Sequence, residues 1–189
     1  MSSRFSAAAL LFVALVFPVS AALADELGEV TRLHHAGQTA AALERAERTL
    51  VANPKDAQMR FLKSVILADT GRTSEAQVLL QQLVQDYPEL AEPHNNLAAL
   101  YAAVGDYGRS RSELEETLRL KPGYAPAQEN LGDVHVLLAA QSYAKALRLE
   151  PSSGTLQRKL ALVRQIVAAP GEAALKPAEP ARPASSARR

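Results

Sequence analysis

Apolar residues along most of the chain recur at helical spacing, in segments separated by short turn signals. Between about residues 26 and 151 they lie three or four positions apart, which is typical of helices with one buried face. The interruptions repeat every 34 residues, as glycines and, 17 residues later, prolines: Gly37, Gly71 and Gly105, then Pro54, Pro88 and Pro122. Each unit therefore predicts two helices, with a turn at the glycine and a stop at the proline.

These units resemble the tetratricopeptide repeat family, which has the same period. The third unit has the family's residues in its first half and turn, at Leu97-Ala98, Tyr101 and Gly105-Asp106-Tyr107. Its second half has the small, bulky, small and proline positions of the family, at Ser110, Leu114, Thr117 and Pro122. The second unit has Lys63-Ser64 in place of Leu-Gly, and the first has Ala46 in place of a bulky residue. The resemblance implies stacked helix pairs forming a right-handed superhelix with a concave face.

The fourth unit lacks the residues of the turn. His135 takes the place of Tyr101, and Ala139 takes the place of Ser110. His135 and Ala139 are four positions apart, whereas Tyr101 and Ser110 are nine positions apart. No glycine or proline falls between Asp133 and Glu150. We therefore expect one fused helix from about Pro126 to Glu150, with His135 packed against its neighbours.

After Pro151, apolar residues again share one helical face: Leu156, Leu160, Val163, Ile166 and Val167. This pattern predicts a capping helix over the last apolar surface of the array. The expected fold is all-α: a right-handed superhelical solenoid of about three and a half helix pairs, the fused long helix, and the cap. The expected domain is 25–169.

The N-terminal residues 1–24 have the features of a signal peptide. Arg4 precedes an apolar run from Ala7 to Phe17, and Ala22-Leu23-Ala24 supplies small residues for cleavage after Ala24. We expect export to the periplasm, with secretion as the alternative. A retained membrane anchor is the other interpretation of this run, although it is short for a bilayer. No later stretch is expected to span a membrane.

Residues 170–189 have the composition of a disordered tail, rich in alanine, proline and arginine. A solvated end is the simpler interpretation. Its net positive charge also fits weak attachment to an acidic wall or membrane surface.

Composition and charge exclude several kinds of function. The chain has no cysteine, so disulfides, thiol chemistry and cysteine-ligated metals are excluded. A formal net charge of +1 argues against nucleic acid as a partner. His34-His35 are adjacent and so point apart on a helix, and His94 is expected at the surface. We expect no catalytic residues, no metal and no cofactor.

The family resemblance implies that ligand-facing residues come from the first helix of each pair. The positions expected to bind a peptide or partner are Phe61, Val65, Asp69, Asn95, Asn96, Ala99, Glu129, Asn130 and Asp133. The family's clamp for a C-terminal carboxylate uses basic residues, which are missing at these places. An apolar, amide-lined groove for an extended segment or a helix is expected instead. The alternative is that these residues simply pack together.

The function predicted from these features is that of a periplasmic adaptor or scaffold that binds another protein in its groove. One alternative is a client-holding chaperone or assembly factor for an envelope enzyme or a cytochrome. Another is a structural homo-oligomer, and a homodimer through the fused helix 126–150 is possible because its apolar residues surround much of its circumference.

Overall fold

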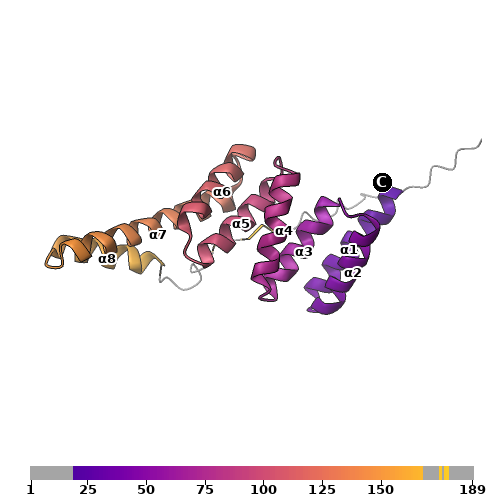
Figure 1. The fold of residues 1–189 in the computed structure, drawn as a ribbon, viewed down its shortest axis with the longest axis horizontal. Helices are drawn as coiled ribbons and strands as arrows, with labels where there is room; N and C mark the ends of the chain where they lie inside the picture. Colours follow the sequence, from indigo (N-terminus) through magenta and orange to yellow (C-terminus); the bar gives the residue numbers. More distant parts are fainter. Residues whose placement is uncertain (1–18, 168–174, 176, 179–189) are drawn as a thin grey trace, which may run out of the picture.

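The computed structural model describes residues 19–167 together with 175, 177 and 178. Within this part of the chain the regular structure is helical, with eight helices; the first seven succeed one another along the long axis, and α8 turns back beside α7 (Figure 1). Their bounds are α1 (Val19–His35), α2 (Thr39–Ala52), α3 (Ala57–Asp69), α4 (Thr73–Asp86), α5 (Ala91–Ala103), α6 (Tyr107–Leu120), α7 (Ala125–Leu149) and α8 (Gly154–Val167).

The first six helices form three pairs, as the 34-residue pattern predicts. Each pair turns at a glycine in the left-handed region, with φ of +72°, +75° and +79° at Gly37, Gly71 and Gly105. The residue after each glycine donates its N–H five residues back, to the carbonyls of Leu33, Leu67 and Tyr101, at 2.9 Å in every case. This hydrogen bond closes the end of the first helix as in a Schellman motif.

Small side chains let the two helices of each pair approach closely. Ala42, Ala76 and Ser110 are completely buried, one in each second helix. The second helix of each pair also packs against the first helix of the next, so α2 contacts α3, α4 contacts α5, and α6 contacts α7. The apolar core is thereby carried from one pair to the next, as stacked repeats require.

The fused helix is confirmed. α7 has 25 residues, runs from Ala125 to Leu149, and differs by one residue at each end from the prediction. α8 packs back along it, and the two helices extend from the repeats as an arm, defined here as residues 136–167 (Figure 1). Val134, before the arm, is fully buried, whereas the apolar side chains that follow it on α7 are half-buried or exposed.

The expectation that His135 is packed is wrong, because its side chain is exposed. In the third unit, Arg109 on the second helix covers the corresponding Tyr101, with its guanidinium 4.2 Å from the ring centroid. In the fourth unit the missing turn sends the chain straight on, so that cover is lost.

The described N-terminal helix begins at Val19 and continues through the predicted cleavage site at Ala24. Residues 1–18 lie outside the described part, so signal-peptide cleavage stays a prediction. None of the described helices combines the length and the apolar character needed to cross a membrane.

Candidate functional site

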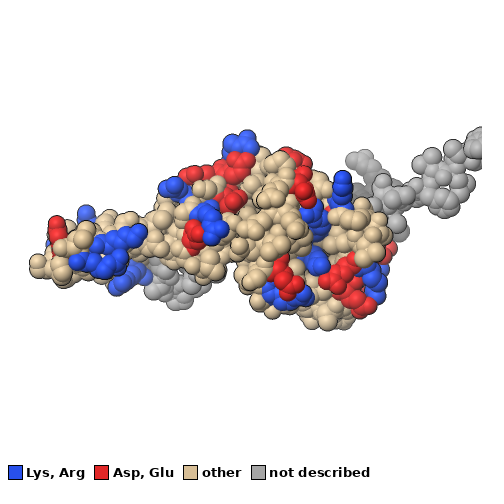
Figure 2. Space-filling view, in the orientation of Figure 1, with Lys and Arg blue, Asp and Glu red and all other residues tan. Residues whose placement is uncertain are grey.

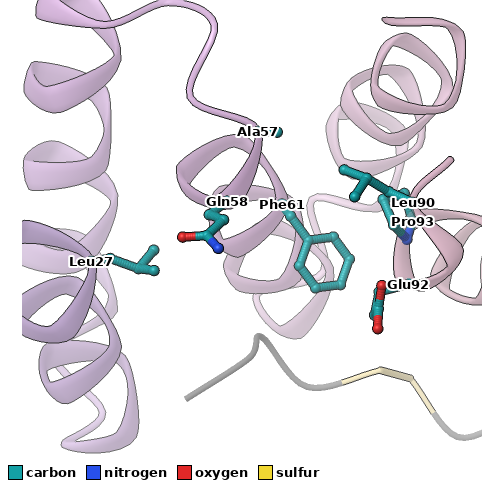
Figure 3. Close-up of a pocket in the computed structure, with 7 residues that line it drawn as sticks. All are labelled: Leu27, Ala57, Gln58, Phe61, Leu90, Glu92 and Pro93. Atoms are coloured by element: carbon teal, nitrogen blue, oxygen red, sulfur yellow. The ribbon is translucent and has the colours of Figure 1, made fainter. Parts of the chain in front are cut away.

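A groove runs between α3 and α5, and side chains from these two helices line most of it. It contains two hollows that follow one another along the helices. The first, the Phe61 pocket, has a volume of about 140 Å³ and is shown in Figure 3. Its lining residues are Leu27, Ala57, Gln58, Phe61, Leu90, Glu92 and Pro93.

The second hollow, the Asn96 cavity, lies one helical turn further along α3 and α5. It has a volume of about 40 Å³, and its lining residues are Ser64, Val65, Ala68, Asp69, Leu80, Asn96, Ala99, Leu100 and Pro177. Four predicted site residues thus meet in one place: Val65, Asp69, Asn96 and Ala99. The lining is apolar apart from two amide or carboxylate side chains and one hydroxyl, which suits an uncharged segment.

Phe61 lies at the junction of the groove and the core. Its ring points into the first hollow (Figure 3), yet only 7% of the residue is exposed. It shares an apolar cluster with Leu80, Leu97 and Ala178, a residue of the C-terminal segment. Phe61 therefore lines the Phe61 pocket with a side chain that is mostly covered by its neighbours.

The three predicted asparagines form a hydrogen-bonded row. Asn130 Nδ2 on α7 donates to Asn95 Oδ1 at 3.0 Å, and Asn95 Nδ2 donates to Asn96 Oδ1 at 3.3 Å. Asn95 and Asn130 are completely buried, and Asn96 is 6% exposed. Buried amides need such partners, and the row orients the amide of Asn96 within the groove.

The acidic residues predicted for the site are dispersed. Asp69 lies at the rim of the Asn96 cavity, and its Oδ2 pairs with His34 Nε2 at 2.9 Å, which links α3 to α1. Glu129 is exposed on α7 and Asp133 is half-buried one turn later. The structure does not place these two α7 residues among the side chains that line the hollows.

The expectation that His94 lies at the surface is wrong. The residue is 8% exposed, and its Nδ1 is 2.6 Å from Glu113 Oε2 on α6. This pair ties α5 to α6, so His94 has a packing role. Among the described residues, no three histidine, aspartate or glutamate side chains gather closely enough to hold a metal ion.

One feature of the groove has no signal in the sequence, which is that residues of the C-terminal segment lie in it. Ala178 is 2% exposed, and Pro177 lines the Asn96 cavity. Leu175, which is 9% exposed, packs outside these hollows against Ala98, Leu114 and Val134. Leu175, Pro177 and Ala178 belong to the stretch 170–189, for which disorder is predicted from composition. The rest of that stretch lies outside the described residues.

Comparison with known proteins agrees with the repeat pattern. Residues 33–104 match the family model described as "Tetratricopeptide repeat". The Hsp70-Hsp90 organizing protein of Triticum aestivum is 31% identical over 105 residues, which are 53% of this chain and 18% of that protein. Cellulose synthase 2 operon protein C of Komagataeibacter xylinus is 27% identical over 156 residues, or 74% of this chain and 12% of that protein. The chain thus spans less than a fifth of each of these relatives.

Solved structures show the same architecture. A thermophilic tetratricopeptide repeat protein of Thermus thermophilus has a TM-score of 0.57 and 25% identity, covering 76% of this chain and 82% of that one. The MamA protein has a TM-score of 0.56 at 17% identity, covering 79% and 83% of the two chains. Residues 33–104 thus match the tetratricopeptide repeat, and the solved structures share the all-helical fold over about three-quarters of this chain.

Proposed function

We propose that this chain is an exported adaptor that binds an extended segment of a partner protein in the groove between α3 and α5. One observation carries the proposal: the side-chain amide of Asn96 bonds both the backbone N–H and the backbone C=O of a single residue, Ala178. A groove that pairs with both backbone groups has the chemistry to bind an extended peptide. The similarity to the Hsp70-Hsp90 organizing protein supports a role in bringing proteins together.

The experiment that tests this function is crosslinking in the cell that makes the protein. A photoreactive residue replaces Asp69, whose side chain is 52% exposed at the rim of the Asn96 cavity. The matched control carries it at Val51, which is 83% exposed at the end of α2. We expect a discrete crosslinked protein at position 69 that is missing at position 51. Equal patterns at both positions would contradict a partner site in the groove.

The same crosslinking experiment, made with substituted chains, tests whether Asn96 and Phe61 contribute to partner binding. Asn96→Ala removes both backbone hydrogen bonds, so we expect partner capture to weaken at least about tenfold, or roughly 1.4 kcal/mol. Phe61→Ala is a poorer probe, because removing a buried phenylalanine costs about 3–5 kcal/mol of folding stability. Thermal melts accompany both variants, and a loss of capture that only follows unfolding would argue against a binding role for Phe61.

The periplasm is part of the proposal. The apolar run in residues 1–24 and the small residues before Asp25 support export. We expect the mature protein recovered from the periplasm to begin at Asp25, as determined by intact mass. A chain that keeps Arg4 would make the segment an anchor.

A homodimer through the arm is the second candidate. Large apolar side chains are exposed there, at Leu149 (85%), Leu162 (60%) and Ile166 (52%). Lys and Arg side chains also gather on the arm (Figure 2), and their like charges oppose self-association. Inserting the turn Val104-Gly105-Asp106-Tyr107-Gly108 after Leu138 restores the missing five residues and should abolish such a dimer. A wild-type chain that stays monomeric at high micromolar concentration would exclude it.

A further inference from the structure

Pro177 and Ala178 lie in the groove of their own chain. Ala178 lies 82 positions after Asn96 in the sequence, yet the two residues share two hydrogen bonds. Asn96 Oδ1 accepts from the N–H of Ala178, and Asn96 Nδ2 donates to its carbonyl oxygen at 3.2 Å. In Figure 1 a short yellow piece of the chain lies beside α5. One asparagine therefore satisfies both backbone groups of one residue.

The asparagine row prepares Asn96 for this contact. Asn95 donates to Asn96 Oδ1, and Asn130 donates to Asn95. Because each amide has its oxygen and nitrogen assigned by its neighbour, the row defines which end of Asn96 donates and which accepts. The site is thus set for a backbone running in one direction. Asn96 binds only backbone groups of the segment, so any preference for particular side chains must come from the residues around it.

The described side chains of the segment pack in apolar surroundings. Ala178 packs in the cluster of Phe61 and Leu80, and Leu175 packs in the cluster of Ala98, Leu114 and Val134. Pro177 lies in the Asn96 cavity. These side chains carry no charge, and a charged one would lose its hydration at such buried positions.

We propose that the segment with Leu175, Pro177 and Ala178 is a resident ligand of the groove, and that a partner segment must displace it to bind. The inference rests on the proposed function and adds a class of partner: an extended stretch with leucine, proline and alanine at the three positions that pack against the helices. Leu175 follows the end of α8 at Val167 by only about eight residues. A short tether of this kind gives the segment an effective concentration in the millimolar range, so a partner's apparent affinity is reduced while the segment is bound.

The test uses the full chain and a synthetic fluorescent peptide with the sequence of residues 172–181, Glu-Ala-Ala-Leu-Lys-Pro-Ala-Glu-Pro-Ala. The segment is released by Leu175→Asp with Ala178→Asp, which places charges at two buried positions. A second release variant, Ala178→Pro, removes the N–H that donates to Asn96 Oδ1 and puts a ring carbon in its place, without adding charge. The control, Ser185→Asp with Ser186→Asp, adds the same charge at other positions of the tail.

We expect fluorescence anisotropy to show the peptide binding the released chains at least about tenfold more tightly than the wild type and the control. Adding Asn96→Ala to a released chain should remove that gain. Equal binding to wild-type and released chains, or binding to neither, would overturn the proposal. A wild-type mass that rises with concentration and returns to the monomer on release would also overturn it, because the segment would then occupy a second copy.

The crosslinking and peptide-binding experiments distinguish failure of the proposed adaptor function from failure of the resident-ligand proposal. If the peptide binds only released chains but no protein is crosslinked at position 69, the resident ligand stands and the adaptor fails. If a protein is crosslinked while the peptide does not distinguish the variants, the adaptor stands and the resident ligand fails.

Discussion

The third and fourth units share the repeat positions from Asn96 and Asn130 onward but differ in packing. In the third, Gly105 turns the chain back, and Ser110 and Leu114 on the second helix are completely buried. In the fourth, the corresponding Ala139 and Tyr143 are only half-buried, because the chain continues as one helix. Five missing residues therefore change a packed pair into an arm. Burial in a repeat protein depends on the turn that returns the second helix, as well as on the apolar pattern.

The largest expected difference between the two units is in the cost of removing a leucine. Leu114→Ala empties a fully buried position and should lower the free energy of unfolding by about 2–5 kcal/mol. Leu147→Ala, on the half-buried part of α7, should cost about 1 kcal/mol, because less apolar surface is lost. Urea unfolding of both variants measures these costs. Equal losses would show that the arm is packed as closely as the repeats.

Replacing a glycine with alanine should change the free energy of unfolding in opposite directions at a repeat turn and inside the fused helix. Gly71 has φ +75°, so Gly71→Ala should destabilise the chain by about 1–2 kcal/mol through backbone strain alone, since an added Cβ has no neighbour within 4 Å. Gly132 lies within α7, also with open space around it. Gly132→Ala should stabilise the chain by about 0.5–1 kcal/mol. Thermal unfolding measures both variants. If both substitutions raise the melting temperature, or both lower it, the left-handed turn at Gly71 and the helical conformation of Gly132 would not explain the effects.

The smallest expected difference concerns the N-terminal cap of the second helix. The third unit has such a cap, whereas the fourth has none, because its two helices are fused into α7. In the third unit, Asp106 accepts from the backbone N–H of Arg109 at 3.1 Å and from its guanidinium at 2.6 Å. These contacts favour the charged carboxylate and hold the pKa of Asp106 below its ordinary value. The resulting stabilisation is present above the pKa of the unfolded chain, near about 4, and is lost as the pH falls through the lower folded value.

Asp106→Asn keeps a capping side chain without the charge. The drop in urea midpoint between pH 7 and pH 3 should therefore be slightly smaller in this variant than in the wild type. An identical drop in both proteins would show that Asp106 does not contribute to the acid sensitivity.

Most of the fold could be predicted from the sequence, since its signals are local. The 34-residue spacing of Gly71 and Gly105 indicated the pairs, and the missing turn before Ala139 indicated the fused helix. These predictions needed only helix periodicity and turn chemistry. The exposure of His135 was missed because a family position was carried over without the helix that normally covers it.

The site was harder to predict, because it depends on contacts between distant residues. Val65, Asn96 and Ala99 were identified through the family resemblance, and they do line one cavity. The contact of Asn96 with Ala178 leaves no periodic signal, since the tail is poor in bulky residues and its partner is 82 positions away. Of the three asparagines, Asn96 contacts Ala178, whereas Asn95 and Asn130 form the row behind it. This difference depends on how the helices pack, so it could not be predicted from sequence spacing.

The central claim is that Asn96 binds a peptide backbone, and amide hydrogen exchange at Ala178 tests it most directly. In the full-length chain, NMR should show this amide exchanging at least about tenfold more slowly than in the free peptide of residues 172–181. Asn96→Ala should remove the protection while the amides of α3 and α5 stay protected. An Ala178 amide that exchanges as fast in the wild-type chain as in the free peptide would contradict the account.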